Sequence, residues 1–239
     1  MRLDGRACDE MRRLGFIRGF TMYAEGSVLV TLGDTKVICN ASVEERVPPF
    51  LLGKKRGWVT AEYAMLPRAT GTRSARESEM MKRSSRSVEI QRLIGRALRM
   101  AVDMEKLGER TITIDCDVIQ ADGGTRTAAI TGGFVALTDA CNRLVARGML
   151  AESPIKQEIA AISVGVVDGQ PVLDLCYEED SRAEVDMNLV MNAQGEFIEL
   201  QGTGENAAFP PEVLARLLAL GTAGCATAIR AQREALSRN

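Results

Sequence analysis

The Gly-Gly-Thr-Arg-Thr stretch at 123–127 constrains this 239-residue chain most, because it joins a buried-strand pattern to a helical one. The strand pattern covers 111–120, and apolar residues at helical spacing fill 130–145. Two glycines permit a sharp turn close to a ligand, and the N–H groups of a helix N-terminus, joined by Arg126, favour an oxyanion such as phosphate. Alternatively, a threonine of this turn only caps the helix while Arg126 points into solvent, and the motif alone leaves both interpretations open.

The sequence contains no histidine, which narrows the chemistry available to it. Ser-His-Asp and Cys-His catalysis, histidine proton shuttles and histidine-ligated zinc are excluded. The six cysteines form no C-x-x-C pair and mostly stand among apolar residues, as is typical of reduced core thiols in a cytoplasmic protein. Residues 1–13 lack the apolar core of a signal peptide, and Arg216 interrupts the most apolar late stretch, 213–229, so we expect no membrane segment.

Charged residues are unevenly distributed, although the formal net charge is only −2. Residues 68–99 contain nine basic and three acidic side chains, whereas five of the nine residues at 178–186 are carboxylates. A basic region and an acidic region in one chain indicate an anionic ligand and a cation in the same protein.

Secondary-structure patterns divide the chain into two similar halves, about 1–150 and 151–239. The first is predicted to contain strands at 27–32, 35–43, 57–63 and 111–120, a polar loop at 68–85, a helix at 87–106 with Arg92, Arg96 and Arg99 on its polar face, and a helix ending near 147. The second is predicted to contain strands at 158–167, 172–178, 185–191 and 197–201, and then helices at 211–236. Strands come first and helices last in both halves, which favours an α+β fold of duplicated βαβα halves with helices packed between two mixed sheets. No linker separates the halves, so we expect residues 1–239 to form one folding unit.

Asp180 and Asp186 bracket a polar corner between two predicted strands. Two carboxylates brought together there suit Mg²⁺, which takes one or two carboxylates and keeps waters for substrate phosphates. The alternative is an acidic, solvated loop, which is the interpretation we give to Glu178, Glu179 and Glu184. Phosphoryl chemistry without histidine needs a metal or a carboxylate, so the aspartate pair gains weight once a phosphate site is granted.

Arginines near the predicted polar loop could also bind anions. Arg86 stands just before the predicted helix and could join Arg126 around one anion, with the helix dipole contributing. Arg68, Arg73 and Arg76 could grip successive phosphates of a nucleic acid, although a solvated loop is an equally good interpretation of each one alone. Too few aromatic residues lie nearby to argue for base stacking.

Several separated sequence blocks, in order along the chain, resemble the ribonuclease PH family. They are AEGSV at 24–28, GDTKV at 33–37, GWVTAEY at 57–63, MLPR at 65–68, EIQRLIGRALR at 89–99, DCDVIQADGGTRTA at 115–128 and QGT at 201–203. The resemblance runs through nearly the whole chain. It implies the duplicated fold predicted above and a phosphate-dependent exoribonuclease that trims tRNA 3′ ends.

The resemblance also implies a reaction and roles for named residues. Inorganic phosphate attacks the terminal phosphodiester of RNA and reversibly releases a nucleoside diphosphate. The residues implied to hold the phosphate are Arg86, Gly124, Thr125 and Arg126, the last also as a catalytic residue. Asp180 and Asp186 are implied to bind Mg²⁺ or to assist proton transfer to the leaving 3′ oxygen, with the division of roles open. Arg68, Arg73 and Arg76 match the family's tRNA-binding arginines, and the family assembles as a homohexamer, a trimer of dimers.

Three alternatives to phosphorolysis make different demands on the sequence. A non-catalytic RNA-binding ring subunit predicts loss of the aspartates or of Arg126, yet all are present. A P-loop nucleotide hydrolase fails because no G-x-x-x-x-G-K-[ST] occurs. Two-metal hydrolysis stays open, since paired carboxylates serve it too. One departure from the family pattern is Ser85, where many relatives carry glycine before the arginine; a positive φ there would be unfavourable for serine.

Overall fold

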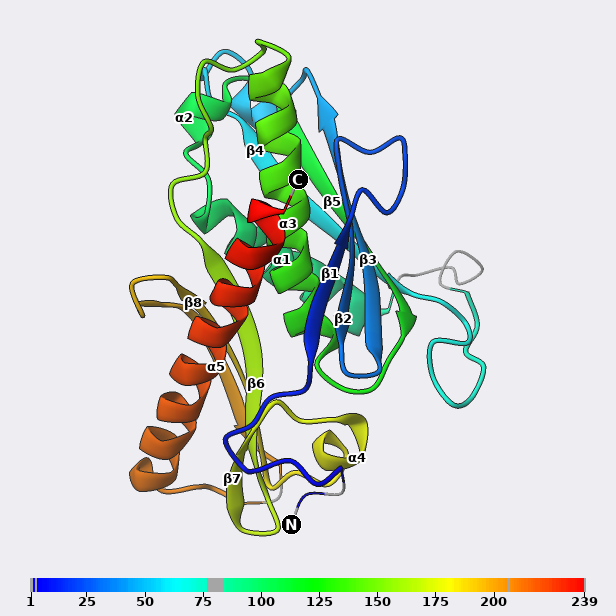
Figure 1. The fold of residues 1–239 in the computed structure, drawn as a ribbon, viewed down its shortest axis with the longest axis vertical. Coiled ribbons are helices and arrows are strands. Elements are labelled where there is room, and N and C mark those ends of the chain that lie inside the picture. The colour runs from blue at the N-terminus through cyan, green and yellow to red at the C-terminus, as the bar shows by residue number, and fades with distance from the viewer. Residues whose placement is uncertain (1, 3, 77–83, 206, 239) are drawn as a thin grey trace.

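Five strands form the first sheet, in the order β1-β2-β3-β5-β4 (Figure 1). They are β1 (Leu14–Arg18), β2 (Gly26–Leu32), β3 (Thr35–Glu44), β4 (Trp58–Met65) and β5 (Thr111–Gln120). Buried and partly exposed residues alternate along β3, as expected of a strand with one face on a core. β4 runs parallel to β5 because a helical crossover joins them, and the other pairs are antiparallel. The structure is a computed structural model that describes residues 2, 4–76, 84–205 and 207–238.

Four strands form the second sheet, in the order β7-β6-β8-β9. They are β6 (Ile159–Val167), β7 (Gln170–Leu173), β8 (Val185–Asn192) and β9 (Phe197–Gly204). All three pairings are antiparallel, since short turns join β6 to β7 and β8 to β9. The prediction of two mixed sheets therefore holds for the first sheet, whereas the second is antiparallel.

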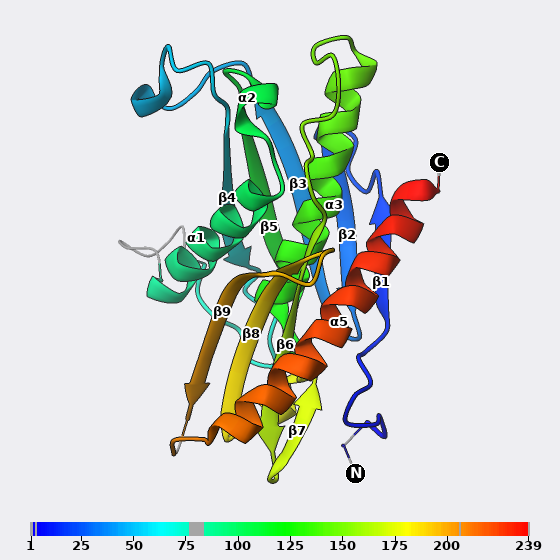
Figure 2. The same cartoon turned by 90° about the vertical axis from the view of Figure 1, so that its left-hand side faces the viewer.

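Three long helices lie against these sheets (Figure 2). α3 (Thr125–Ala146) contacts β2, β3 and β5 of the first sheet and β6 of the second, so it is sandwiched between them as predicted. α1 (Ser85–Met100) packs on β4 and reaches β9, and α5 (Pro211–Ser237) covers β6, β7 and β8 and extends to β1. Shorter helical turns are η1 (Pro49–Leu51), α2 (Met104–Leu107) and α4 (Tyr177–Asp180).

The largest buried cluster is shared by both halves of the chain. Phe134 and Leu137 of α3 pack with Ile114 of β5, and the same cluster includes Ile159 of β6 and Val190 of β8. Removing this apolar surface from water is the main favourable term in folding, and here it requires both sheets at once.

The helix predicted at 87–106 differs from the observed one at both ends. It begins earlier, at Ser85, because the Ser84 side chain accepts a hydrogen bond from the Ser87 N–H and caps it. It ends at Met100, since Val102 pairs with Ile155 and Asp103 caps α2. Arg99 also departs from the predicted polar face, as its guanidinium lies 4.4 Å from the centre of the Trp58 ring.

The strand predicted at 172–178 ends at Leu173. Asp174 adopts a positive φ of 57°, which breaks the extended backbone, and Tyr177 then opens α4. The helices predicted at 211–236 are the single helix α5, and β1 was not predicted at all. The predicted loop at 68–85 contains no helix or strand at 68–76, its residues 77–83 lie outside the described residues, and its last residue belongs to α1.

Helix α5 is long and apolar enough to cross a membrane, by length and composition only. Its buried residues, among them Leu217, Cys225 and Ile229, face the second sheet and the core clusters beside it. One third of its most apolar 18-residue window is buried, and an amphipathic helix that covers one face of a sheet can have the same overall composition.

Candidate active site

The turn between β5 and α3 has the conformation that the two glycines were predicted to permit. Gly123 and Gly124 have positive φ values of 71° and 65°. A Cβ atom on Gly123 would lie 2.6 Å from the Leu175 carbonyl oxygen, so a side chain is also excluded by close approach of the second half. The turn therefore ends tightly against the segment that leads into α4.

Among the residues that the structure describes, no side-chain hydrogen bond caps the N-terminus of α3. The Thr127 hydroxyl donates to the Gly124 carbonyl at 2.9 Å, and the Thr125 hydroxyl lies 2.8 Å from the hydroxyl of Tyr63, on β4. The interpretation of these threonines as helix caps is therefore wrong, and the first N–H groups of α3 remain available for an anion. Burial raises the pKa of Tyr63, partly offset by its hydrogen bond to Thr125, so the phenol is neutral and holds the Thr125 side chain in place.

Arg126 is held by side chains from two other elements. Its Nη1 donates to Oε1 of Gln201, on β9, at 2.8 Å, and lies 3.6 Å from Oε1 of Glu89, on α1. Nε2 of Gln201 donates to the same Glu89 oxygen at 2.8 Å. Only 16% of the Arg126 side chain is exposed, so it does not point into bulk solvent as the alternative interpretation required.

Asp180 ends α4 and Asp186 lies near the start of β8. Both line a cavity of about 330 Å³, whose walls also include Arg86, Thr125 and Arg126. The structure therefore brings together the predicted anion turn, the arginine of α1 and the aspartate pair, although they come from positions up to 100 residues apart in the sequence. Arg86 itself is largely exposed and lies in the first turn of α1, and Ser85 before it has no positive φ.

The two carboxylates influence one another. Burial and the negative charge of Asp180 raise the pKa of Asp186 to about 6, against the opposing charge of Arg126. Desolvation also raises the pKa of Asp180, although much of this residue is exposed, and Arg86 and Arg126 act in the opposite direction. Like charges that share a cavity in this way are stabilised by a cation between them.

The donor set in the cavity fits a cation that is shared with a substrate. Within the described residues no group of three or more cysteine, aspartate or glutamate side chains could hold a metal ion. Mg²⁺ needs only one or two carboxylates when waters and substrate phosphates complete its shell. Asp180 and Asp186 therefore suit Mg²⁺ bound together with a phosphate, and not a closed protein cage.

The arginines predicted to grip RNA lie beyond the cavity walls. Arg68, Arg73 and Arg76 are exposed and follow β4. The start of their segment is fixed, since the Ala121 N–H donates to the Ala69 carbonyl at 2.8 Å and Thr70 lines the cavity. The segment then folds back on itself, since the Ser74 N–H donates to the Pro67 carbonyl at 2.9 Å. It thus passes the cavity at Thr70 and presents its three arginines to solvent.

Some residues of the cavity were missed in the sequence. Ser163 of β6 and Asn188 of β8 are directly paired across the second sheet, and both are buried polar residues. Ser163 is the lone polar residue of an apolar strand, which is a signal that could have found it, whereas β8 also carries Asp186 and Asn192 and so gives no such signal for Asn188. Gln201 lies in a block that carries the family resemblance, but its partner, Arg126, could not be predicted from sequence spacing.

Known proteins resemble this chain in sequence and in fold. Models of the 3′ exoribonuclease family match residues 10–141 (domain 1) and 157–224 (domain 2). Ribonuclease PH of Bacillus velezensis is 60% identical over 237 residues, which cover 99% of this chain and 97% of that protein. The crystal structure of rice Rrp46 matches with a TM-score of 0.79 at 20% identity over 99% of this chain and 100% of that one. The Archaeoglobus fulgidus exosome with RNA bound to the active site matches with a TM-score of 0.79 at 23% identity over 99% and 92%, and these two likenesses show the fold alone.

We predict that Asp180→Asn lowers the pKa of Asp186 from about 6, because it removes the neighbouring negative charge. The pKa should stay above its ordinary value of 3.8, since burial is the larger cause. Titration of the metal-free protein followed by carboxyl ¹³C NMR measures this shift. Glu178→Gln, on the exposed side of the same helix, is the control and should leave Asp186 unchanged; an unaltered pKa in Asp180→Asn would show that the two carboxylates do not interact.

Proposed function

The chain belongs to the ribonuclease PH family of 3′ exoribonucleases, and on that premise we propose that its 330 Å³ cavity is the site of phosphorolysis. The protein is a phosphate-dependent 3′ exoribonuclease, a nucleotidyltransferase of tRNA processing. Inorganic phosphate is its co-substrate. The observation that supports the location best is the convergence of Arg126 and the uncapped start of α3 with Asp180 and Asp186 in one cavity.

The attacking phosphate is assigned to the turn and the two arginines of the cavity. The N–H groups of Thr125 and Arg126 and the guanidiniums of Arg86 and Arg126 would bind its oxygens, while Gly124 lets the backbone approach. A phosphate oxygen forms a bond to the terminal phosphorus of RNA, and the bond from that phosphorus to the 3′ oxygen of the preceding nucleotide breaks. The departing 3′ oxygen takes a proton, and the last nucleotide leaves as a diphosphate.

Asp180 and Asp186 are assigned to Mg²⁺ binding and to proton transfer. When bound, Mg²⁺ would neutralise charge that develops on the reacting phosphoryl oxygens. The raised pKa of Asp186, about 6, lets this carboxyl hold or release a proton close to neutral pH, as a general acid must. Arg126 can affect both phosphate binding and proton transfer, because it lies at the anion turn and its charge lowers the pKa of each aspartate.

We assign the RNA chain upstream of the cleaved bond to Arg68, Arg73 and Arg76. Their exposed positions on a segment that passes the cavity support contacts to several backbone phosphates. Such contacts recognise any RNA, so they would hold tRNA precursors and other 3′ ends without reading bases.

The assembly and the surroundings of the enzyme complete the proposal. We propose a homohexamer, a trimer of dimers, because large apolar side chains are exposed on and beside β1, including Ile17, Phe20, Met22 and Tyr23. The solved structures of similar fold include exosome cores.

A cytoplasmic location is supported by six free cysteines, four of them buried. The shared apolar core supports treating residues 1–150 and 151–239 as halves of one folding unit.

We predict that the purified protein, with Mg²⁺ and an RNA carrying an extended 3′ end, releases nucleoside diphosphates only when inorganic phosphate is present. Arg126→Ala should lose this release and bind RNA within about 2-fold of the parent, because it removes a phosphate ligand and not an RNA contact. Arg147→Ala, at the exposed far end of α3, is the control. Monophosphates formed without phosphate would mean hydrolysis, and no release in either tube would mean a non-catalytic subunit.

We predict that Asp180→Asn and Asp186→Asn each lower kcat by about 10²-fold, comparable with the loss of a strong electrostatic contact to a transition state. The affinity for Mg²⁺, measured by Mn²⁺ substitution and its paramagnetic signal, should fall in the same variants. Glu178→Gln again serves as the control. Full activity of both asparagine variants across a Mg²⁺ series would remove the pair from the site.

We predict that replacing Arg68, Arg73 and Arg76 together by alanine raises KM for long RNA and leaves kcat within about 2-fold. The slope of log affinity against log salt should fall by about 2, since each phosphate contact to a single strand contributes about 0.7. The same change at Lys54, Arg56 and Arg147, three exposed cations elsewhere, is the matched control. An unaltered salt slope would argue against phosphate contacts by this segment.

A further inference from the structure

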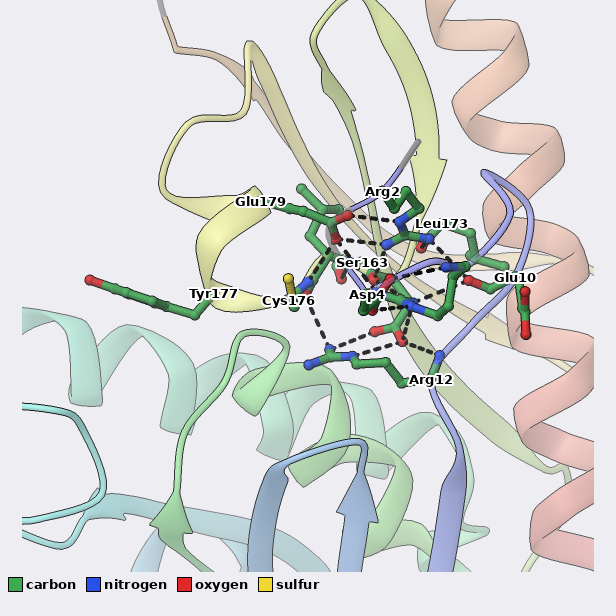
Figure 3. Close-up of polar contacts among 12 residues, drawn as sticks. Arg2, Asp4, Glu10, Arg12, Ser163, Leu173, Cys176, Tyr177 and Glu179 are labelled. Atoms are coloured by element: carbon green, nitrogen blue, oxygen red, sulfur yellow. Dashed lines mark hydrogen bonds and ion pairs between the residues drawn. The ribbon is translucent and has the colours of Figure 1, made fainter.

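Arg12, just before β1, is an almost fully buried arginine whose side chain lies against the segment that leads into α4 (Figure 3). On one edge its Nε and Nη2 donate to the two carboxylate oxygens of Asp174 at 3.0 and 2.7 Å, and Nη2 also donates to the Leu175 carbonyl at 3.1 Å. On the other edge its Nη1 donates to the backbone carbonyl of Asp122 and lies 3.4 Å from the Asp122 carboxylate. The guanidinium therefore bridges the start of the anion turn and the segment that leads into α4.

Asp174 is held in a conformation that its sequence alone does not favour. It has a positive φ of 57° and no solvent exposure. Its carboxylate also accepts the Arg12 backbone N–H at 2.7 Å, and its backbone carbonyl accepts hydrogen bonds from Arg2 at 2.8 Å and Arg6 at 3.0 Å. These partners hold Asp174 in a strained backbone conformation and so fix the direction of the chain that follows it. Strained residues held in this way cluster at functional sites.

Asp180 lies six residues after Asp174, at the end of the single helical turn α4. The Tyr177 N–H donates to Oδ1 of Asp122 at 3.2 Å, a second link between α4 and the anion turn. The Asp180 N–H donates to the Cys176 carbonyl at 2.9 Å. Gly123 leaves no space for a Cβ against the Leu175–Tyr177 backbone, so the turn and this segment touch directly.

The opposite side of α4 is anchored by the same N-terminal region. Glu179 is 1% exposed, and its two carboxylate oxygens accept hydrogen bonds from Nε and Nη2 of Arg2, each at 2.7 Å (Figure 3). The interpretation of Glu179 as part of a solvated loop is therefore wrong, because Arg2 pairs with it in the interior. Helix α4 has only four residues and cannot hold its own orientation. Its position therefore depends on these arginines, and the position of Asp180 depends on α4.

We propose that Arg12 is a positioning residue, which sets the separation between the phosphate-binding turn and the carboxylate of Asp180. This inference rests on the proposed function, because it takes the turn as the phosphate site and Asp180 as a working group. Arginine suits the position because its planar fork reaches both partners at once, whereas a lysine can reach only one. Arg12 lies outside the walls of the catalytic cavity, so it acts through the groups it holds and through its positive charge, which lowers the pKa of Asp180. Arg12→Lys keeps that charge and removes only the bridge.

The test is a double-mutant cycle of Arg12→Lys with Asp180→Asn, measured as single-turnover rates with RNA and phosphate. Arg12→Lys keeps a cation beside Asp174 but loses the bridge, and we expect a 10- to 100-fold loss in rate, the order of magnitude that a misplacement of about 1 Å causes. KM for RNA should stay within about 2-fold. In the Asp180→Asn background the loss caused by Arg12→Lys should shrink to less than about 3-fold, because no carboxylate remains to be positioned.

Two further variants keep the result interpretable. Asp122→Ala, at a side chain that is 32% exposed, keeps the backbone carbonyl that accepts from Arg12 but removes the carboxylate beside Arg12 Nη1, which also accepts the Tyr177 N–H. If Arg12→Lys fails to fold, this variant should show a rate loss of the same kind, and the loss should shrink beside Asp180→Asn. Arg18→Lys is the matched control, since Arg18 makes a similar two-pronged pair with Asp139 at 2.7 and 2.9 Å beside a different cavity, and it should keep the parent rate.

The outcomes separate this inference from the proposed function. If Asp180→Asn alone leaves the rate intact, the proposed site is wrong. If Asp180→Asn slows the reaction but Arg12→Lys does not, or if Arg12→Lys causes the same fold loss in both backgrounds, the site stands and the positioning role of Arg12 is overturned. A smaller loss in the Asp180→Asn background supports it.

Discussion

The packing of α3 against both sheets is the constraint on which the rest of the structure depends. This helix is buried along most of its length, since β2, β3 and β5 cover one side and β6 another. Its N-terminus consequently lines the same cavity as Asp186 and Asn188, both on β8 of the second sheet. The site thus follows from the fold, because a helix clamped between two sheets cannot move its N–H groups away from the groups that face them.

The charged groups that converge there are expensive to bury. Each buried ion pair, such as Arg12 with Asp174 or Arg2 with Glu179, costs desolvation energy of the same order as its Coulombic gain. Replacing such pairs by apolar residues is often neutral for stability, so stability alone does not explain them. These ion pairs fix the orientation of their partners, since hydrogen bonds from a planar guanidinium set both the distance and the plane of the carboxylate.

Local patterns predicted what local forces decide. The hairpin of β2 and β3, the strand β5 and the helix α3 follow from alternation, turn glycines and helical spacing. The glycine turn suggested an anion site, but by itself it left a plain helix cap equally open. The end of α1 at Met100 and the short helix α4 depend on distant partners, namely Ile155 and Arg2. Strand β1 was missed although its partner β2 begins only eight residues after it ends. Arg12 appeared as one charge in a charged N-terminal segment, because nothing nearby in sequence reveals a partner 162 residues away.

The two halves of the chain supply different groups to the cavity, and this shows how a chain without histidine can hold a proton near neutral pH. The first half supplies N–H groups and guanidiniums, which can bind an anion but cannot exchange protons near neutral pH, because arginine stays charged. The second half supplies two carboxylates, and the pKa of Asp186 rises to about 6 only because burial and Asp180 act on it together. A carboxyl tuned in this way covers the pH range that histidine covers elsewhere. The proposed chemistry therefore depends on the interface between the halves, because only there does the carboxyl of Asp186 acquire its raised pKa beside the proposed anion turn.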